Sequence, residues 1–206
     1  MIKLEHTDIH GWEAAIRGMR NALESWDRSD SDFAEYSGSL IKMGENDLKL
    51  MKKLSKAGDD HGKFLRFIDV TVDITAPLYW WKEFDTYKVG TVANSCSTMH
   101  KIHAKEFTLE DFSCEHLLFP VEQLFPTIQI LNGWRSRYLE TKDKKYWWQM
   151  IQLLPTNYNQ RRTIKLNYQV LKHMYHARKH HKLDEWRKVC EWIESLPYFK
   201  EICIDE

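Results

Sequence analysis

Residues 67–87 read FIDVTVDITAPLYWWKEFDTY, and this stretch decides the fold class. Its first half alternates apolar with polar residues, which predicts a strand with one buried and one solvated face. The apolar positions are Ile68, Val70, Val72 and Ile74. Pro77 follows where a helix is expected to begin, because a first helical turn leaves its N–H groups unpaired. We therefore predict a strand that leads directly into a helix.

The predicted helix after Pro77 is rich in aromatic residues, with Trp80 and Trp81 side by side. Burial habits allow two interpretations, a core helix or the wall of a ligand site. Charged residues are interleaved with these aromatics, and Lys82, Glu83 and Lys88 are the nearest. Both interpretations stay open on these residues alone.

The rest of the chain is predicted to be mostly helical, because proline and glycine are scarce in its 206 residues. A short strand and a helix capped near Thr7 or Asp8 open the chain, with Trp12, Ala15, Ile16, Met19 and Leu23 on one helix face. A further helix is expected at residues 44–58, capped by Asn46 or Asp47. Another should follow Pro120, with a break or kink at Pro126. The remaining helices are expected at residues 144–154 and as a pair within residues 163–196. These elements predict a helix-rich α+β fold in one domain, residues 1–206.

Composition excludes several classes of protein. The formal net charge is zero, so no overall field attracts a polyanion. The four cysteines form no CxxC pair, the N-terminus shows no apolar signal segment, and no apolar run reaches the length of a membrane span. We expect a cytoplasmic protein with reduced thiols and no membrane contact.

Four histidines, His173, His176, His180 and His181, lie within nine residues and partly share a helix face. A metal site would need further ligands, and the interleaved lysines and arginine repel a cation, so we predict no metal and interpret the helix as facing an anion. A nucleic-acid patch is disfavoured because acidic residues return at Asp184. A Cys–His hydrolase built on Cys96 is disfavoured as well, since no triad motif accompanies it.

The order of motifs after the strand resembles the flavin-dependent thymidylate synthases, the ThyX family. Members carry a strand, an Ala-Pro, an aromatic-rich helix, an Arg-His-Arg signature and an Asn-Glu-x-Ser-x-Arg stretch. Here Ala76-Pro77 begins the helix, residues 86–88 (Thr-Tyr-Lys) take the place of Arg-His-Arg, and residues 94–99 (Asn-Ser-Cys-Ser-Thr-Met) take the place of the last motif. This order favours the ligand-wall interpretation of the two tryptophans.

The C-terminal third resembles the family more closely. Leu154-Pro155, Asn167 and Arg178 have the family's separations, and His61 lies where its first histidine falls. The resemblance covers residues from about 58 to 190 and rests on order and spacing. It implies a ThyX-like fold with helices on a curved mixed sheet, a homotetramer, and FAD as cofactor.

Site residues follow from the same resemblance. It implies Arg178 and Ser97 as catalytic residues, and Asn167, Lys88, His61 and His173 as cofactor contacts. The substrate contacts would be Arg178, Ser97, Asn94 and Gln169, and the ligands dUMP, NADPH and a methylenetetrahydrofolate carbon donor.

The sequence also departs from the family at Ser95, Met99 and Gln169, which replace a glutamate and two arginines. Each lost arginine removes a bidentate contact worth about 1.5–3 kcal/mol. Lys165, Arg161 and Arg162 are the cations that could compensate. Two hypotheses therefore stay open: a divergent thymidylate synthase, and a catalytically degenerate protein of the same fold that binds flavin or nucleotide or is purely structural.

Overall fold

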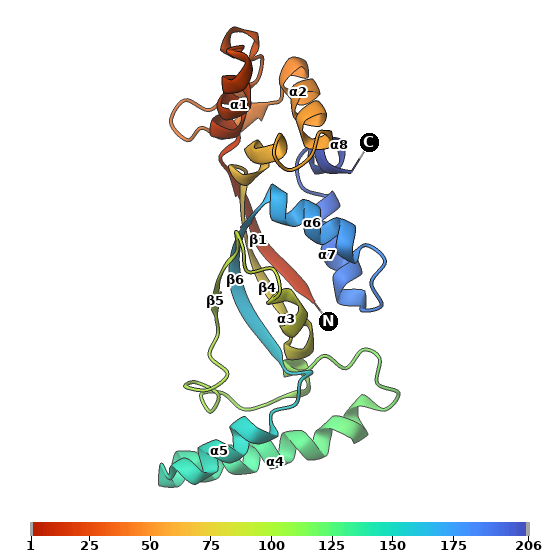
Figure 1. The fold of residues 1–206 in the computed structure, drawn as a ribbon. Coiled ribbons are helices and arrows are strands. Elements are labelled where there is room, and N and C mark those ends of the chain that lie inside the picture. The colour runs from red at the N-terminus through yellow and green to blue at the C-terminus, as the bar shows by residue number, and fades with distance from the viewer. Residues whose placement is uncertain (1, 205–206) are drawn as a thin grey trace. The chain divides into compact units, whose positions relative to one another are not determined.

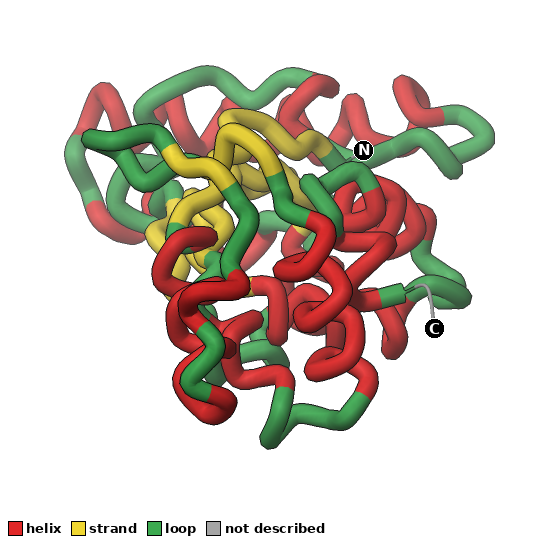
Figure 2. Tube along the Cα trace, turned by 90° about the horizontal axis from the view of Figure 1, so that it is seen from above, coloured by secondary structure: helices red, strands yellow, loops and turns green. Residues whose placement is uncertain are grey.

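A computed structural model describes residues 2–204, and most of its regular structure is helical (Figures 1 and 2). The helices are α1 Trp12–Arg20, α2 Glu45–Lys56, α3 Leu78–Phe84, α4 Pro120–Thr141, α5 Lys144–Leu153, α6 Tyr168–Arg178, α7 Asp184–Glu194 and α8 Phe199–Cys203. Four short 3₁₀ turns are η1 Asn21–Leu23, η2 Trp26–Arg28, η3 Gly62–Arg66 and η4 Leu109–Asp111.

The strands are β1 Lys3–His10, β2 Asp32–Phe33, β3 Leu40–Lys42, β4 Asp69–Pro77, β5 Val92–Ser95 and β6 Asn159–Asn167. Four of them form one sheet in the order β1-β4-β6-β5, and β2 pairs with β3 in an antiparallel ribbon. Strand β4 is the predicted one, and its apolar residues are buried as the alternation requires. The α+β class is confirmed. Strand β6, in contrast, was predicted as part of a helix.

Within the span predicted as a single domain, the described residues form two compact units. The long-helix unit comprises residues 74–86 and 94–162, together with residues 2–3. The α6 unit comprises residues 4–73, 87–93 and 163–204. Strands β1, β4, β5 and β6 each contribute residues to both units.

The α6 unit begins with β1, which continues to His10, so the predicted cap at Thr7 or Asp8 is wrong. Helix α1 starts after Gly11 instead, whose φ of 88° is a left-handed value that glycine adopts without strain. A Cβ at this position would lie 1.9 Å from the Phe67 carbonyl oxygen. Because α1 ends at Arg20, Leu23 leaves the apolar face and is 63% exposed, against the prediction.

Helix α2 is preceded by Gly44, so Asn46 and Asp47 are not its N-cap as predicted. Asp47 is fully buried and pairs with the buried Arg20, whose Nη2 lies 2.6 Å from the Asp47 Oδ1. Burial alone would raise the pKa of Asp47, but hydrogen bonds from Ser31 and Arg20 outweigh burial and hold it below its usual range. The pair ties α1 to α2.

The long-helix unit contains α4 and α5, which pack as a helical hairpin (Figure 1). Its core gathers Ile102, Phe107, Phe112, Leu124, Ile128, Leu131 and Met150. Pro126 lies inside α4 without ending it, since it falls in the second turn of a 22-residue helix. Thr108 caps η4, in a capping box with Asp111.

Trp80 and Trp81 lie in α3 and are buried. They are 0% and 1% exposed and meet edge to face at 4.8 Å between ring centroids. The Trp81 indole N–H donates to the Gln160 carbonyl oxygen at 2.9 Å. Rings that are fully buried present no face to a ligand, so the ligand-wall interpretation is wrong and the core interpretation is correct.

Candidate functional site

Helix α6 carries four of the predicted site residues and begins directly after β6. Asn167 caps it: the side-chain oxygen of Asn167 accepts from the Val170 N–H at 3.1 Å. The cap uses the oxygen of the amide and leaves its nitrogen as a donor at the start of the helix. Asn167 therefore opens the helix that ends at Arg178, as it does in the family that the sequence resembles.

Arg178 ends the same helix, about 16 Å from Asn167 at the usual rise per residue. Its Nε donates to the Tyr87 hydroxyl at 2.9 Å. The guanidinium also lies 4.8 Å from the ring centroid of the buried Trp186 in α7. A hydroxyl and an aromatic face thus fix the position of this cation.

Segment 87–90 approaches both ends of α6. Tyr87 holds Arg178 at the C-terminal end, and Gly90 approaches the N-terminal end. A Cβ at Gly90 would lie 3.0 Å from Val170 Cγ2 and 3.2 Å from Asn167 Nδ2. Lys88 lies between these two anchors in the chain, is exposed, and forms no ion pair within residues 2–204. Segment 87–90, which carries Lys88, therefore contacts α6 both at Arg178 and near Asn167.

A second polar group lies at the first turns of α6. The Gln169 Nε2 donates to Asp59 Oδ1 at 2.8 Å, and His173 Nε2 lies 3.0 Å from Asp59 Oδ2. Burial raises the pKa of Asp59, but hydrogen bonds from His173 and Gln169 and the His173 charge outweigh it and lower the pKa. His61 is exposed and precedes Gly62, which packs against Gln169. Three predicted residues, His61, Gln169 and His173, thus belong to one region.

Asn94 and Ser97 belong to the long-helix unit, whereas the other predicted site residues belong to the α6 unit. Asn94 is exposed in β5. The Ser97 hydroxyl oxygen accepts from the backbone N–H groups of Met99 and His100, at 3.1 and 2.8 Å. Ser97 therefore stabilises its own turn, and its role toward a ligand stays a prediction.

Two of the cations expected to compensate for lost arginines pair with carboxylates of the chain itself. Arg162 donates to Asp85 Oδ1 at 2.7 Å and stacks over the Trp81 ring at 4.1 Å. Lys165 lies 2.9 Å from Asp69 Oδ2. Because both charges are balanced locally, the expectation that Arg162 and Lys165 replace the missing arginines is not supported.

The histidine cluster separates into different surroundings. His173 contacts Asp59, His176 Nε2 lies 3.1 Å from the Cys203 carbonyl oxygen, and His181 Nδ1 accepts from the Leu183 N–H at 3.2 Å. Across residues 2–204, no three His, Cys, Asp or Glu side chains are grouped to hold a metal ion. In the same part of the chain, no helix is long and apolar enough to cross a membrane.

All four cysteines are free thiols. Burial raises the pKa of Cys190 to about 11 and that of Cys203 to about 12, so neither is a ready nucleophile. Cys96 is exposed, and the neighbouring Ser97 hydroxyl is engaged in its turn.

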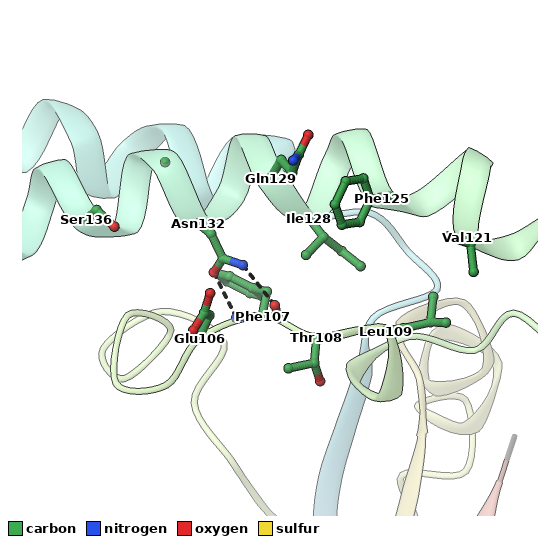
Figure 3. Close-up of a pocket in the computed structure, with 11 residues that line it drawn as sticks. Glu106, Phe107, Thr108, Leu109, Val121, Phe125, Ile128, Gln129, Asn132 and Ser136 are labelled. Carbon is green, nitrogen blue, oxygen red and sulfur yellow. Dashed lines mark hydrogen bonds between the residues drawn. The ribbon is translucent and has the colours of Figure 1, made fainter.

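A cavity of about 660 Å³ in the long-helix unit lies between α4 and residues 106–109. Figure 3 shows Asn132 bridging to the Phe107 backbone, which it contacts at 2.9 and 2.8 Å. Glu106 is the one ionisable residue in the lining, and the walls include Phe125 and Ile128. None of the predicted site residues lines this cavity, and it offers no cation to an anionic ligand.

Three residues of the candidate site were not predicted: Tyr87, Trp186 and Asp59. Tyr87 falls within the Thr-Tyr-Lys that replaces a basic signature, so its position in the sequence was the available signal. Asp59 precedes His61 by two residues. Trp186 carries no local signal, because only packing of α7 on α6 brings it to Arg178.

Comparisons with known proteins agree with this architecture. No family model matches the sequence, and no curated protein does. Among solved structures, ThyX from Helicobacter pylori, a flavin-dependent thymidylate synthase complexed with FAD and dUMP, matches with a TM-score of 0.69 and 15% identity over 99% of this chain and 98% of that one. The chain has the ThyX fold.

A second structure broadens the ThyX-fold comparison. The UMP/dUMP methylase PolB from Streptomyces cacaoi, bound with 5-Br dUMP, matches with a TM-score of 0.68 and 14% identity, over 98% of this chain and 93% of that one. The predicted ThyX-like fold is therefore confirmed over nearly the whole chain.

Proposed function

We propose that this chain binds FAD and a uridine monophosphate nucleotide and methylates dUMP to dTMP. The observation that carries the proposal is the assembly of Arg178, Lys88 and Asn167 along α6 by segment 87–90. Arg178 at the end of α6, the Asn167 amide at its start and Lys88 in the segment that contacts both ends suit ligands that present phosphates and carbonyl oxygens. ThyX of Helicobacter pylori, which shares the fold, was solved with FAD and dUMP.

The residues of the α6 unit fit a flavin nucleotide. The close approach of Gly90 to Asn167 and Val170 leaves backbone without a side chain beside the Asn167 amide nitrogen, as close contact with a cofactor requires. The Gln169 Oε1 is buried and accepts no hydrogen bond from residues 2–204. Asn167, Lys88, His61 and His173 would hold the cofactor, which supplies hydride-transfer chemistry when bound.

Arg178 is the residue we propose for the anionic part of the pyrimidine nucleotide. A cation held in advance by Tyr87 and Trp186 needs little reorganisation when charge develops on a ligand. Arg178 would therefore act by positioning and electrostatics. NADPH as reductant, methylenetetrahydrofolate as carbon donor, the homotetramer, the cytoplasmic location and the contacts of Ser97, Asn94 and Gln169 remain predictions from the resemblance.

A catalytically degenerate protein is the second candidate, and a specific observation favours it. Ser95 and Met99 stand where the family motif has a glutamate and an arginine, and both are exposed. Without these charges, flavin and nucleotide could bind with no turnover. PolB, a UMP/dUMP methylase, has the same fold, so the substrate test should include UMP.

The test uses purified protein with added FAD. Uptake of flavin, a change of its spectrum on dUMP addition, and tritium release from 5-tritiated dUMP with NADPH and methylenetetrahydrofolate would support the enzyme. Binding of both ligands without tritium release would support the degenerate protein. No uptake of FAD would refute the enzyme and would leave only a degenerate protein that binds nucleotide alone or is purely structural. Arg178→Ala should abolish the dUMP response, whereas Arg187→Ala, which removes an exposed cation on α7, should not.

A further inference from the structure

We propose that a basic cavity beside α2 is a binding site for a small phosphorylated molecule of nucleotide size. This α2 cavity has a volume of about 480 Å³ and belongs to the α6 unit. It is lined by Arg20, Leu23, Ser25, Arg28, Asn46, Lys49, Leu50 and Lys53. None of these residues takes part in the proposed FAD and dUMP site, so the inference goes beyond the proposed function.

One wall of the α2 cavity is a single helix face. Asn46, Lys49, Leu50 and Lys53 are spaced i, i+3, i+4 and i+7 along α2, which places them side by side. The other wall comes from residues 20–28, where α1 ends and η1 and η2 follow. Two elements far apart in sequence thus present cations toward one hollow.

The charge of the lining has one sign. Arg20, Arg28, Lys49 and Lys53 are cationic, and no aspartate or glutamate lines the cavity. Within residues 2–204, Arg28, Lys49 and Lys53 form no ion pair, which differs from the locally balanced Arg162 and Lys165. Grouped cations without carboxylates repel one another, and a bound anion relieves that repulsion.

Arg20 forms a rigid and buried part of the lining, so the exposed cations of the cavity are Arg28, Lys49 and Lys53. Its Nε donates to Asp47 at 2.7 Å and its Nη1 to the Ser25 carbonyl oxygen at 3.1 Å, while the side chain is only 4% exposed. The Nη2 lies close to Asp47 but makes no hydrogen bond within the described chain. Asp47 also accepts from Ser29, Asp30 and Ser31, so its charge is shared among several donors.

The volume of the α2 cavity and its apolar lining residues indicate which class of ligand it would bind. Pockets for small organic ligands occupy about 300–1,000 Å³, and a lone phosphate would fill little of 480 Å³. Leu23 and Leu50 give the hollow an apolar part beside its cations. A phosphate joined to a ring-bearing group satisfies both parts, as in a nucleotide. The zero net charge of the chain disfavours an extended nucleic acid.

The test measures binding of inorganic pyrophosphate and of ATP to the full chain by calorimetry, at low and at physiological salt. The double variant Lys49→Ala/Lys53→Ala removes two exposed lysines and should fold normally. We expect its affinity for pyrophosphate to fall by at least about tenfold, because charge-assisted contacts are lost. Lys188→Ala, an exposed lysine on α7 outside the cavity, should leave the affinity unchanged.

The same measurements separate this site from the proposed FAD and dUMP site. Arg178→Ala should lose the dUMP response and keep pyrophosphate binding. The double lysine variant should lose pyrophosphate binding and keep the dUMP response. Unchanged pyrophosphate affinity in the double variant would overturn the proposal. Loss of dUMP binding in that variant, or binding of a single-stranded oligonucleotide without binding of ATP, would overturn it as well.

Discussion

The Arg178 Nε donates a 2.9 Å hydrogen bond to the hydroxyl of Tyr87, a residue 91 positions earlier in the chain. This bond joins the end of α6 to the segment that carries Lys88 and Gly90. A guanidinium that two aromatic residues position before any ligand arrives loses less conformational freedom on binding. The site thus depends on a tyrosine that has no charge of its own.

Tyr87→Phe should leave the fold intact and weaken the dUMP response. The change removes one hydrogen bond to a charged group, so we expect about tenfold weaker dUMP binding and a stability loss of about 1 kcal/mol. Flavin absorbance titration and urea unfolding measure the two effects. Tyr36→Phe, at a side chain that is 97% exposed, is the matched control and should change neither.

Gly90→Ala should destabilise the α6 unit. Gly90 has a φ of 77°, which costs a residue with a Cβ about 1–2 kcal/mol, and the new methyl would crowd Val170 and Asn167. We expect a lower unfolding free energy and weaker FAD binding. Gly133 lies in α4, and a Cβ added there would have no heavy atom within 4 Å apart from the backbone of its own helix. Gly133→Ala should therefore stabilise the helix by up to about 1 kcal/mol. Equal effects at both glycines would contradict the proposed role of Gly90.

Asp47→Asn should be the most damaging of these substitutions. It leaves the buried Arg20 guanidinium without its counter-charge, and breaking such a pair costs about 3–5 kcal/mol. Urea unfolding at neutral pH measures the loss. Glu13→Gln removes one partner of an exposed i,i+4 pair with Arg17 and should cost less than about 0.5 kcal/mol.

The Asp47 pair also predicts a pH dependence. The folded-state pKa of Asp47 is lowered, so its stabilising contribution is present above the unfolded-state pKa of about 3.9 and is lost as pH falls through the folded-state value. The stability difference between the wild-type chain and Asp47→Asn should therefore shrink below about pH 4. A difference that stays constant down to pH 2 would show that Asp47 carries no such linkage.

Ser97→Ala tests whether Ser97 does more than support its turn. Loss of two backbone contacts should cost about 0.5–2 kcal/mol, by analogy with helix caps. If Ser97 also contacts the nucleotide, dUMP binding should weaken while FAD binding stays. Ser136→Ala, at an exposed helical serine, should affect neither property. Weakened stability with unchanged dUMP binding would restrict Ser97 to its turn.

Local patterns in the sequence predicted several elements well. The alternation of residues 68–75 predicted β4, and Pro77 correctly marked the start of the following helix. The position of Asn167 at the start of α6 was implied by the family resemblance, whereas the local pattern placed it inside a helix. The first two features depend on backbone geometry and side-chain periodicity within a few residues, so a single sequence is enough to find them.

Other features depended on packing that no local pattern reports. The β6 residues TIKLN looked helical because α6 follows without a break, and only pairing with β4 and β5 makes them a strand. The paired tryptophans are compatible with either a core or a ligand wall, and burial decides for the core. Arg162 and Lys165 were predicted to be free for a ligand, but each pairs with a carboxylate that is distant in the chain, Asp85 and Asp69 respectively.

The sequence by itself determined the α+β class and the strand-to-helix transition at Pro77, and it placed a helix over residues 168–178 while extending that helix wrongly into β6. The tertiary structure alone decided which cations pair with carboxylates of the chain itself. An ion pair forms between residues that are distant in the chain, such as Arg162 and Asp85, and its formation requires the backbone to bring them together. The same reason explains why the contact of Arg178 with Tyr87, 91 positions earlier, could not be read from a local pattern.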